Sequence, residues 1–401
     1  MKKILLLGGS AQQVIAIKTA KRLGYYTVLC DYLPDNPGQY AADKYYNVST
    51  TDVEAVYKVA MDEKVDGILA YASDPAALPA AIVAERLGLP TNPSASVAVL
   101  GVKHNFRKFL GENGFACPRN FTFKVGADIE ELKEKMQELD FPIVVKPTDS
   151  SGSKGVTVLK SAEGLDAAIA LAESYSRNKI LIVEEFIESN FPAVIGGDIF
   201  VWDGKVILYG EMACLRGSEH NGLIPVGEKS PAGLNSKQIE NVHKELQRII
   251  TMLGIKFGEL NIEILLDKND NVHFLELGPR AGGNMIPIEL SDIFNVDLVE
   301  ANVLAAMGEN PKLQPVRQSG FFTTYVLHSY KDGQFEGISI ANKIRSNVYR
   351  REIYKKTGDI VESFDGAGKA VGILFLRFDT EMELQYFCSN HEKLVAVELI
   401  K

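Results

Sequence analysis

Two glutamates, Glu263 and Glu276, lie in the stretch FGELNIEILLDKNDNVHFLELGPRAGG and have the spacing of partners in a β-hairpin. A turn centred on Asn269 and Asp270 would place the two carboxylates directly opposite each other. Like charges opposed across strands repel, so the pair predicts either a shared proton or a cation between the carboxylates. Hard cations such as Mg²⁺ bind carboxylate oxygens. Arg280 follows closely in the sequence and adds positive charge, a combination typical of phosphate chemistry.

The proposed register also pairs Leu265 with Phe274 and Asp267 with Val272. Apolar residues flank the glutamates on both faces of both strands, which predicts a hairpin buried on both sides. Two anions buried without a partner would be costly. Burial therefore favours a metal site over a ladder of solvated glutamates.

A second candidate site follows the strand PIVVK, which ends at Lys146. The loop after it is rich in small polar residues and includes Ser150, Ser151, Gly152, Ser153, Lys154 and Gly155. The backbone N–H groups of such a loop can close around phosphate oxygens while the lysine supplies a point charge. The loop is not a Walker A motif, because it leads into a strand rather than a helix. Taken alone, a flexible hairpin with an exposed lysine explains the segment equally well.

A third motif is the strand KILIVEE, which ends in Glu184 and Glu185 and continues as Phe186 and Ile187. We expect the edge of this strand to become free here, so that its backbone groups are able to bind an adenine edge. Alone, the pattern is more typical of solvated glutamates. Lys103, in the connector GVKHNFRKFL, is by itself typical of an exposed lysine at the start of a helix.

The polar loop LRGSEHNG holds Arg216, Glu219 and His220, and loops of this kind concentrate substrate contacts. A solvated loop explains these residues as well. The other histidines and the four cysteines have no spacing typical of a zinc site or a disulfide framework.

The composition is that of an ordinary globular protein, with 401 residues of which 46% are hydrophobic and 24% are charged. A net charge of −9 argues against nucleic acid as the main partner. The N-terminus MKKILLLGGS predicts a first strand rather than a signal peptide, and no apolar run is long enough to span a bilayer. We therefore expect a cytoplasmic protein with no membrane partner.

The elements around these motifs fall into distinct patterns. Residues 1–95 alternate strand and helix, which predicts a parallel sheet with helices on its faces. The first turn, GGSAQQ, lacks the third glycine of a dinucleotide fingerprint, so a nicotinamide or flavin site is the weaker interpretation. Residues from 120 on predict a compact α+β module, followed by strands, a long helix over 236–253 and the carboxylate hairpin.

Taken in order, these motifs resemble the ATP-grasp superfamily: Lys103, Lys146 with its loop SSGSKG, the strand end VEEFI, and Glu263 through Glu276 to Arg280. The similarity covers nearly the whole chain and extends to biotin carboxylase, to purine-pathway ligases such as phosphoribosylglycinamide synthetase, and to the L-amino acid ligases. It implies an ATP-grasp fold of mixed α/β and α+β class. The implied divisions are a Rossmann-like pre-ATP-grasp domain (1–100), a helical connector (101–119), a small ATP-grasp lobe or lid (120–190), a large lobe with the metal site (191–310) and a C-terminal mixed α/β lobe (311–401).

In the family, ATP lies between the two lobes of the grasp, which implies a role for each matching position. The implied phosphate contacts are Lys103, Lys146 and the loop from Ser150 to Gly155, and the implied adenine contacts are Glu184, Phe186 and Ile187. Glu263 and Glu276 would bind Mg²⁺, or Mn²⁺ in its place. Arg280 and Lys146 would act on the transferred phosphoryl group.

The chain departs from the family pattern at two positions. Family members commonly have an asparagine two residues after the second metal-binding glutamate, where this chain has Gly278. The metal contacts, and the number of metal ions, are therefore expected to differ. The family also often has a ribose-binding acid shortly after the adenine segment, and Glu188 is the candidate to replace it.

The resemblance implies an ATP-dependent ligase that activates a small-molecule carboxylate as an acyl phosphate and joins it to an amine, releasing ADP and phosphate. A carboxylase that activates bicarbonate would use every one of the same ATP-site residues. A non-catalytic ATP-sensing module is a third interpretation, against which the intact glutamate pair and Arg280 argue. Related enzymes are often dimers, so a homodimer is the assembly to test, and the sequence names neither substrate.

Overall fold

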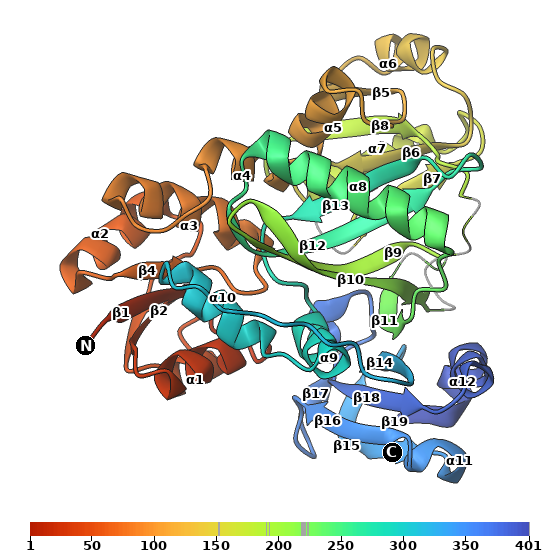
Figure 1. Cartoon of the computed structure of the whole chain (residues 1–401). Coiled ribbons are helices and arrows are strands. Elements are labelled where there is room, and N and C mark those ends of the chain that lie inside the picture. The colour runs from red at the N-terminus through yellow and green to blue at the C-terminus, as the bar shows by residue number, and fades with distance from the viewer. Residues whose placement is uncertain (151–152, 190, 192, 218–221, 223, 401) are drawn as a thin grey trace.

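The computed structural model describes residues 1–150, 153–189, 191, 193–217, 222 and 224–400 (Figure 1). Its described strands form four sheets, with the orders β3-β2-β1-β4, β5-β8-β6-β7, β13-β12-β9-β10-β11-β14-β18-β16 and β17-β15-β19. Within the described residues, no helix combines the length and the apolar character needed to cross a membrane.

The N-terminal sheet is parallel, as its alternating pattern predicts. Strand β1 is almost completely buried because helices cover both faces of the sheet. The elements of this part are β1 (Lys3–Leu7), α1 (Val14–Arg22), β2 (Tyr26–Asp31), β3 (Lys44–Asn47), α2 (Val53–Glu63), β4 (Gly67–Leu69) and α3 (Asp74–Leu87). Two connector helices follow, α4 (Ser94–Gly101) and α5 (Lys103–Glu112).

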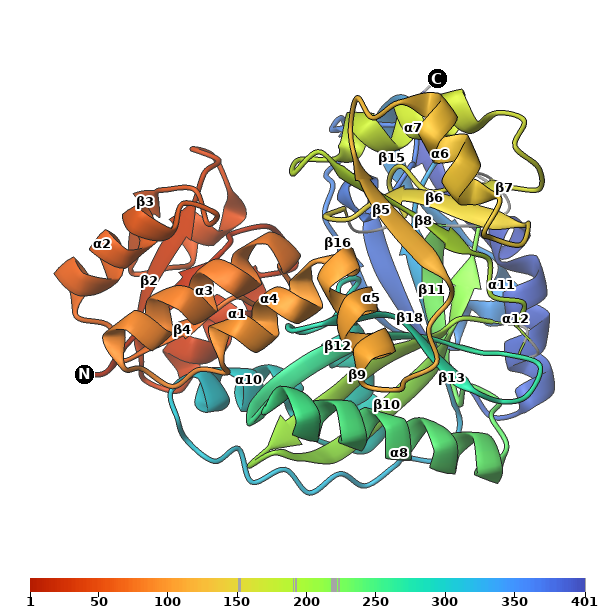
Figure 2. The ribbon, with the colours of Figure 1, turned by 90° about the horizontal axis from the view of Figure 1, so that it is seen from above.

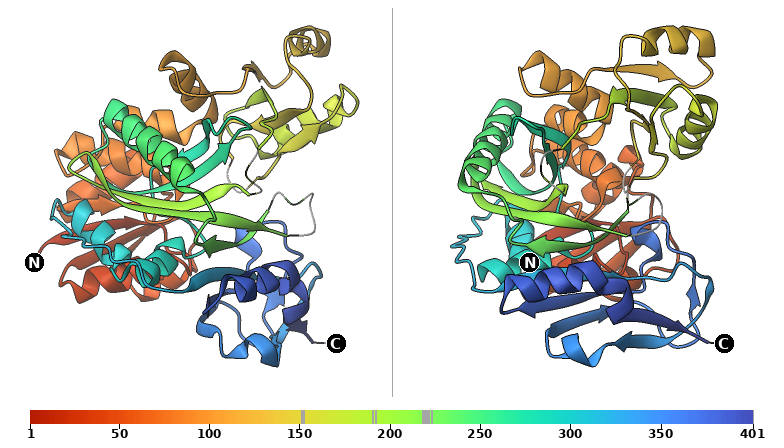
Figure 3. Two further views of the ribbon diagram at one scale, coloured as in Figure 1. Left: turned by 45° about the vertical axis from the view of Figure 1, so that its right-hand side comes forward. Right: turned by 90° about the vertical axis from the view of Figure 1, so that its right-hand side faces the viewer.

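The second sheet is small and antiparallel, and with its helices it projects from the rest of the molecule (Figure 3). It contains β5 (Asn120–Lys124), α6 (Ile129–Met136), β6 (Ile143–Pro147), β7 (Thr157–Leu159), α7 (Leu165–Tyr175) and β8 (Ile180–Glu185). Strand β8 lies between β5 and β6 and is paired up to Glu185. The expected free edge at Glu184 and Glu185 is therefore wrong, because hydrogen bonds on both sides occupy this strand.

The eight-stranded sheet carries the carboxylate hairpin at its edge. Helix α8 covers one face of it (Figure 1), and its buried side chains Val242, Leu246, Ile249 and Ile250 pack with Ile262 and Ile264 of the hairpin. A capping box at Asn235 starts this helix and Gly254 ends it in a left-handed conformation. The elements are β9 (Ile195–Trp202), β10 (Lys205–Arg216), β11 (Pro225–Ser230), α8 (Ser236–Leu253), β12 (Phe257–Leu266), β13 (Val272–Gly278), α9 (Ile286–Phe294) and α10 (Leu298–Ala306).

Strands from the end of the chain complete the same sheet, because β14 pairs with β11 and β18 pairs with β14 and β16. A separate three-stranded sheet and helix α12 pack beside them around a second core. The elements are β14 (Phe321–Leu327), β15 (Gly333–Ile340), α11 (Asn342–Arg345), β16 (Val348–Ile353), β17 (Ile360–Val361), β18 (Gly372–Phe378), α12 (Glu381–Leu394) and β19 (Val395–Leu399).

Helix α10 joins the N-terminal sheet to the large sheet. It lies beside β4 and α1 in two perpendicular views (Figures 1 and 2). The approach to β4 is so close that a Cβ at Gly67 would lie 2.4 Å from the carbonyl oxygen of Ala306. Only glycine fits at this position. The N-terminal sheet is therefore held at a fixed position relative to the carboxylate hairpin.

Candidate functional site

The hairpin of β12 and β13 pairs Glu263 with Glu276, as the sequence predicts. Beyond this pair, the predicted register is wrong by one residue: Ile264 lies opposite Phe274, and Leu266 lies opposite Val272. The register shifts between Glu263 and Ile264, where a β-bulge leaves Leu275 without a partner. The bulge compensates for a turn with an odd number of residues.

Three residues form this turn, since the N–H group of Asp267 donates to the carbonyl of Asn271 at 3.2 Å. Asp270 takes the left-handed conformation that such turns require. The Asp267 carboxylate accepts hydrogen bonds from the N–H groups of Asn269 and Asn271. These contacts fix the far end of the hairpin.

Only one face of the hairpin is buried in the core, which corrects the expectation of burial on both faces. Ile262 and Ile264 are fully buried, whereas Glu263 and Glu276 lie half-buried on the opposite face. Desolvation by burial and the neighbouring Glu276 raise the pKa of Glu263. Lys103 Nζ lies 3.2 Å from Glu276 Oε2 and partly balances the pair.

Lys146 is buried next to Glu184, and the two side chains form an ion pair. The same carboxylate accepts a hydrogen bond from Arg107 Nε at 2.9 Å, and Arg107 is itself fully buried. Burial alone would raise the pKa of Glu184, but Arg107 and Lys146 lower it to about 2. Both oxygens of Glu184 are therefore engaged by protein cations, although an adenine contact was expected for this residue.

Arg107 also connects this ion-pair cluster to the hairpin. Its two Nη atoms donate to the carbonyl oxygens of Phe274 and Leu275, each at 3.1 Å. These carbonyls flank the bulge, so the guanidinium satisfies backbone acceptors on the edge strand. Arg107 is not among the residues that the sequence predicts for the site. Its apolar neighbours in KHNFRKFLGE gave the only hint that it is buried.

The loop after Lys146 lies against the connector helix α5. Lys103 donates to the carbonyl of Ser150, and Ser150 Oγ donates to the carbonyl of Lys154 at 2.9 Å. Ser153 and Gly155 have left-handed backbone conformations, which curl the loop back toward β7. Two of the expected phosphate-binding positions, Ser151 and Gly152, lie outside the described residues.

Phe186, Ile187 and Glu188 follow β8, and both Phe186 and Glu188 are exposed. The N–H group of Phe186 donates to the carbonyl of Pro142 at 2.9 Å, so this donor is already used. Arg216, expected in a loop, is the last residue of β10, whereas Glu219 and His220 lie outside the described residues.

Arg280 reaches the N-terminal domain instead of standing free beside the glutamates. Its Nε and Nη2 atoms form a bidentate pair with the two oxygens of Asp74, at 2.6 and 2.8 Å. Burial would raise the pKa of Asp74, but Arg280 and the more distant Lys103 and Arg177 lower it. Gly278 permits this arrangement, because a Cβ there would lie 3.3 Å from the Arg280 guanidinium carbon.

A cavity of about 450 Å³ lies between the N-terminal domain and the hairpin. Its charged and polar lining includes Asp74, Lys103, Asp149, Ser150, Arg177 and Glu276. The cavity thus brings together Lys103 and Glu276, which the sequence predicts as site residues. Asp149 and Arg177 also line this cavity. Both lie in polar stretches of the sequence, which gave no indication of a site.

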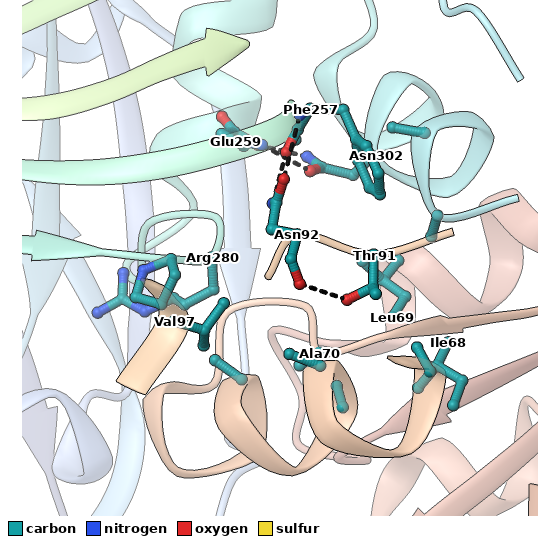
Figure 4. A pocket seen from close by; sticks show the side chains of 18 of the residues that line it. Ile68, Leu69, Ala70, Thr91, Asn92, Val97, Phe257, Glu259, Arg280 and Asn302 are labelled. Carbon is teal, nitrogen blue, oxygen red and sulfur yellow. Dashed lines mark hydrogen bonds between the residues drawn. The ribbon is translucent and has the colours of Figure 1, made fainter. Parts of the chain in front are cut away.

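A smaller cavity of about 90 Å³ lies beside Arg280, between the N-terminal part of the chain, β12 and α10 (Figure 4). Asn92 donates to the carbonyl of Phe257 at 2.9 Å, and Asn302 of α10 donates to the Glu259 carboxylate of β12 (Figure 4). Burial and the nearby Asp198 raise the pKa of Glu259 well above its usual range.

Comparison with known proteins decides what kind of site this geometry represents. The family model described as "Carbamoyl-phosphate synthase L chain, ATP binding domain" matches residues 103–312. The chain belongs to this family. Its members are ATP-grasp proteins, which confirms the resemblance drawn from the sequence and makes the protein an ATP-grasp enzyme of the ligase class.

Curated relatives and solved structures agree with this membership. A formate-dependent phosphoribosylglycinamide formyltransferase from Parasynechococcus marenigrum (strain WH8102) is 26% identical over 324 residues, covering 77% of each chain. The L-amino acid ligase from Bacillus licheniformis has the same fold, with a TM-score of 0.82 at 19% identity and coverage of 100% of this chain and 99% of that one.

The biotin carboxylase domain of Hydrogenobacter thermophilus 2-oxoglutarate carboxylase, solved with MgADP, ADP and bicarbonate, is also similar. It has a TM-score of 0.77 at 18% identity and covers 100% of this chain and 92% of that one. These likenesses confirm the expected ATP-grasp fold.

Proposed function

We propose that the protein uses Mg²⁺-ATP to convert a carboxylate into an acyl phosphate and joins the acyl group to an amine, releasing ADP and phosphate. The observation that carries the proposal is the pairing of Glu263 with Glu276, with Lys103 at 3.2 Å from the second carboxylate. Opposed carboxylates and adjacent lysines suit a magnesium-bound triphosphate.

The donor set fits Mg²⁺ bound partly by its substrate. Among the described residues, no group of three or more histidine, cysteine, aspartate or glutamate side chains is placed to hold a metal. Two carboxylates would therefore leave the other coordination positions to phosphate oxygens and water, as is usual for Mg²⁺. When bound, the cation would supply charge neutralisation at the β- and γ-phosphates. Mn²⁺ would suit the same oxygen donors.

The chain's own cations would stabilise the phosphates. Lys103 and Lys146 would contact ATP, and Glu184 would position Lys146 rather than contact adenine. An oxygen of the substrate carboxylate attacks the γ-phosphorus, the bond to the β-phosphate oxygen breaks, and ADP leaves. Arg280, held by Asp74, would bind the transferred phosphoryl group or the acyl phosphate. No nucleophilic side chain is needed for this step.

Two further contacts are proposed for the nucleotide. The covering loop from Ser150 to Gly155 would close over the phosphates through its backbone N–H groups. The backbone around Phe186 and Ile187 would bind adenine through groups other than the Phe186 N–H, and Glu188 would bind ribose.

The substitution Glu276→Ala tests the proposal. It removes one of the two carboxylates and the partner of Lys103, so ADP formation should fall by about a hundredfold or more with any acid and amine. The substrates are identified beforehand by assaying a panel of acids and amines for ADP and phosphate release and by mass spectrometry of the products. Glu240→Ala, at an exposed position of α8, is the control. Normal turnover in the Glu276 variant would remove the metal role.

A bicarbonate-dependent carboxylase is the second candidate, favoured by the likeness to a biotin carboxylase domain that holds bicarbonate. The curated relatives that use formate favour a small organic acid instead. Measuring whether ADP release requires bicarbonate or formate separates the two. An ATP-sensing module would form no ADP with any acid.

A further inference from the structure

A third cavity, of about 190 Å³, lies beside the carboxylate hairpin and has no role in the mechanism above. Its walls come from β9, β10, β11, β12 and the loop before α9, with Ala72 and Asp74 of the N-terminal part and two residues of the C-terminal lobe. The residues that line it include Gly196, Cys214, Glu228, Glu263, Arg280 and Asn284.

Two oxygen atoms in this cavity wall are buried without any hydrogen-bond partner among the described residues: Glu228 Oε2 and Asn284 Oδ1. Glu228 as a whole is 6% exposed. Buried acceptors are normally satisfied, and an unsatisfied one destabilises the folded state. Both atoms are acceptors, and Glu263 adds further carboxylate oxygens. These two oxygens therefore lack a donor, because Arg280, the cation that also lines the cavity, is paired with Asp74.

The local backbone makes room for this carboxyl group. A Cβ at Gly196 would lie 2.9 Å from Glu228 Oε2 and 3.0 Å from Cys214 Sγ, so only glycine permits the side chain to occupy its place. Cys214 Sγ donates to the other oxygen, Oε1, at 2.8 Å. Burial raises the pKa of the Cys214 thiol well above its usual range, so this group stays a donor. Oε2 is left for a ligand.

We propose that Glu228 binds the amino group of the acceptor substrate, with Asn284 as a second acceptor, and takes a proton from it. The proposal rests on the function proposed above and adds the position of the amine to it. The cavity shares Glu263 and Arg280 with the proposed phosphoryl-transfer site, so an amine there would lie next to the acyl phosphate. Its size suits a small primary amine or the amino group of a larger molecule.

A bound ammonium group gives one proton to Glu228, and the nitrogen lone pair then forms the C–N bond with the acyl carbon. The bond from that carbon to the phosphate oxygen breaks, and phosphate leaves with the electron pair and accepts the second proton. Burial raises the pKa of Glu228 to about 8, with smaller contributions from Glu263 and Asp198 that raise it and from Cys214 and Arg216 that lower it. The carboxylate form of Glu228, which accepts the proton, therefore predominates only above about pH 8, and the step is expected to speed up as the pH rises toward that value.

Amine binding tests the proposal directly. Ammonium, methylamine and glycinamide are titrated separately by calorimetry into the full-length protein with Mg²⁺ and a non-hydrolysable ATP analogue. We expect Glu228→Gln to weaken binding about tenfold or more, because a charge-assisted hydrogen bond is lost. Glu289→Gln is the matched control, since Glu289 is equally buried but does not line the cavity. It should bind the amines as the wild type does.

Three outcomes would overturn the inference: no binding of any of the amines by the wild type, equal affinity in the wild type and Glu228→Gln, or equal losses in both variants. Thermal unfolding shows whether each variant is folded. The ligase proposal is tested separately by trapping the acyl phosphate of the wild type with hydroxylamine. Hydroxamate formation without a Glu228 effect would refute the amine site alone, whereas absence of ADP and hydroxamate would refute the ligase.

Discussion

At the scale of single residues, the ion-pair cluster of Arg107, Lys146 and Glu184 shows how the site is held before ATP binds. One carboxylate faces two buried cations, and Arg107 extends the network to the hairpin. The lysine expected to contact phosphate is thus held in place by the acid expected to contact adenine. The sequence identified both residues, but their mutual distance depends on the pairing of β6 with β8, which spacing alone did not reveal.

Replacing Glu184 with glutamine should destabilise the protein strongly. The variant keeps the shape of the side chain but leaves Arg107 and Lys146 buried without their counter-charge, which typically costs about 3 to 5 kcal/mol. Urea unfolding at neutral pH measures the loss. Glu185→Gln is the control, because its partner Arg119 is a surface residue and such pairs contribute about 0 to 1 kcal/mol. Equal losses in the two variants would contradict the central role of Glu184.

The same cluster predicts a pH dependence. The folded pKa of Glu184, about 2, lies below its ordinary value of 4.5. The stability it contributes is therefore present above pH 4.5 and is lost as the pH falls toward 2. The stability difference between the wild type and Glu184→Gln should shrink over this range. A difference that stays constant would show that the carboxylate is not the titrating group.

At the scale of elements, the hairpin shows what sequence reasoning reaches and where it stops. Alternation and turn residues were enough to pair Glu263 with Glu276. They were not enough to find the bulge at Leu275. A three-residue turn combined with a bulge leaves the pairing of the two glutamates unchanged and shifts the register only between the glutamates and the turn. The bulge depends on Arg107, a long-range partner. Glu228 was missed for a similar reason: β11 approaches Gly196 only through the order of the strands in the sheet.

Strand β9 is predicted to tolerate no side chain at Gly197. Its φ of +101° is strained for any other residue, and a Cβ would lie 2.0 Å from the carbonyl oxygen of Gly210. Gly197→Ala should lower the free energy of unfolding by about 2 to 4 kcal/mol. Gly111→Ala, in helix α5 where a Cβ meets no atom, should stabilise the protein by about 0.5 to 1 kcal/mol. Thermal and urea unfolding measure both, and a neutral Gly197 variant would contradict the strain.

At the scale of the whole molecule, the N-terminal domain completes the site through Asp74. This acid starts helix α3, yet it binds Arg280 at the end of the hairpin, so the arginine proposed to bind the phosphoryl group depends on the docking of a separate sheet. Sequence patterns predicted both the parallel sheet and Arg280, but they contain no information on which surfaces meet. The C-terminal strands illustrate the same limit, because they extend the central sheet across the expected boundary at residues 310–311.

The contribution of this docking contact to stability is measurable, because the same interface also contains exposed ion pairs that serve as a control. Asp74→Asn leaves the nearly buried Arg280 without its counter-charge and should cost about 3 kcal/mol of unfolding free energy. Arg22→Gln breaks the exposed pairs of α1 with Asp297 and Glu300 across the same interface, and should cost about 1 kcal/mol or less. Only the first change should also reduce kcat, since it alone releases the arginine proposed to bind the phosphoryl group. Equal effects on kcat would show that docking of the domain as a whole, rather than the Asp74–Arg280 pair, organises the site.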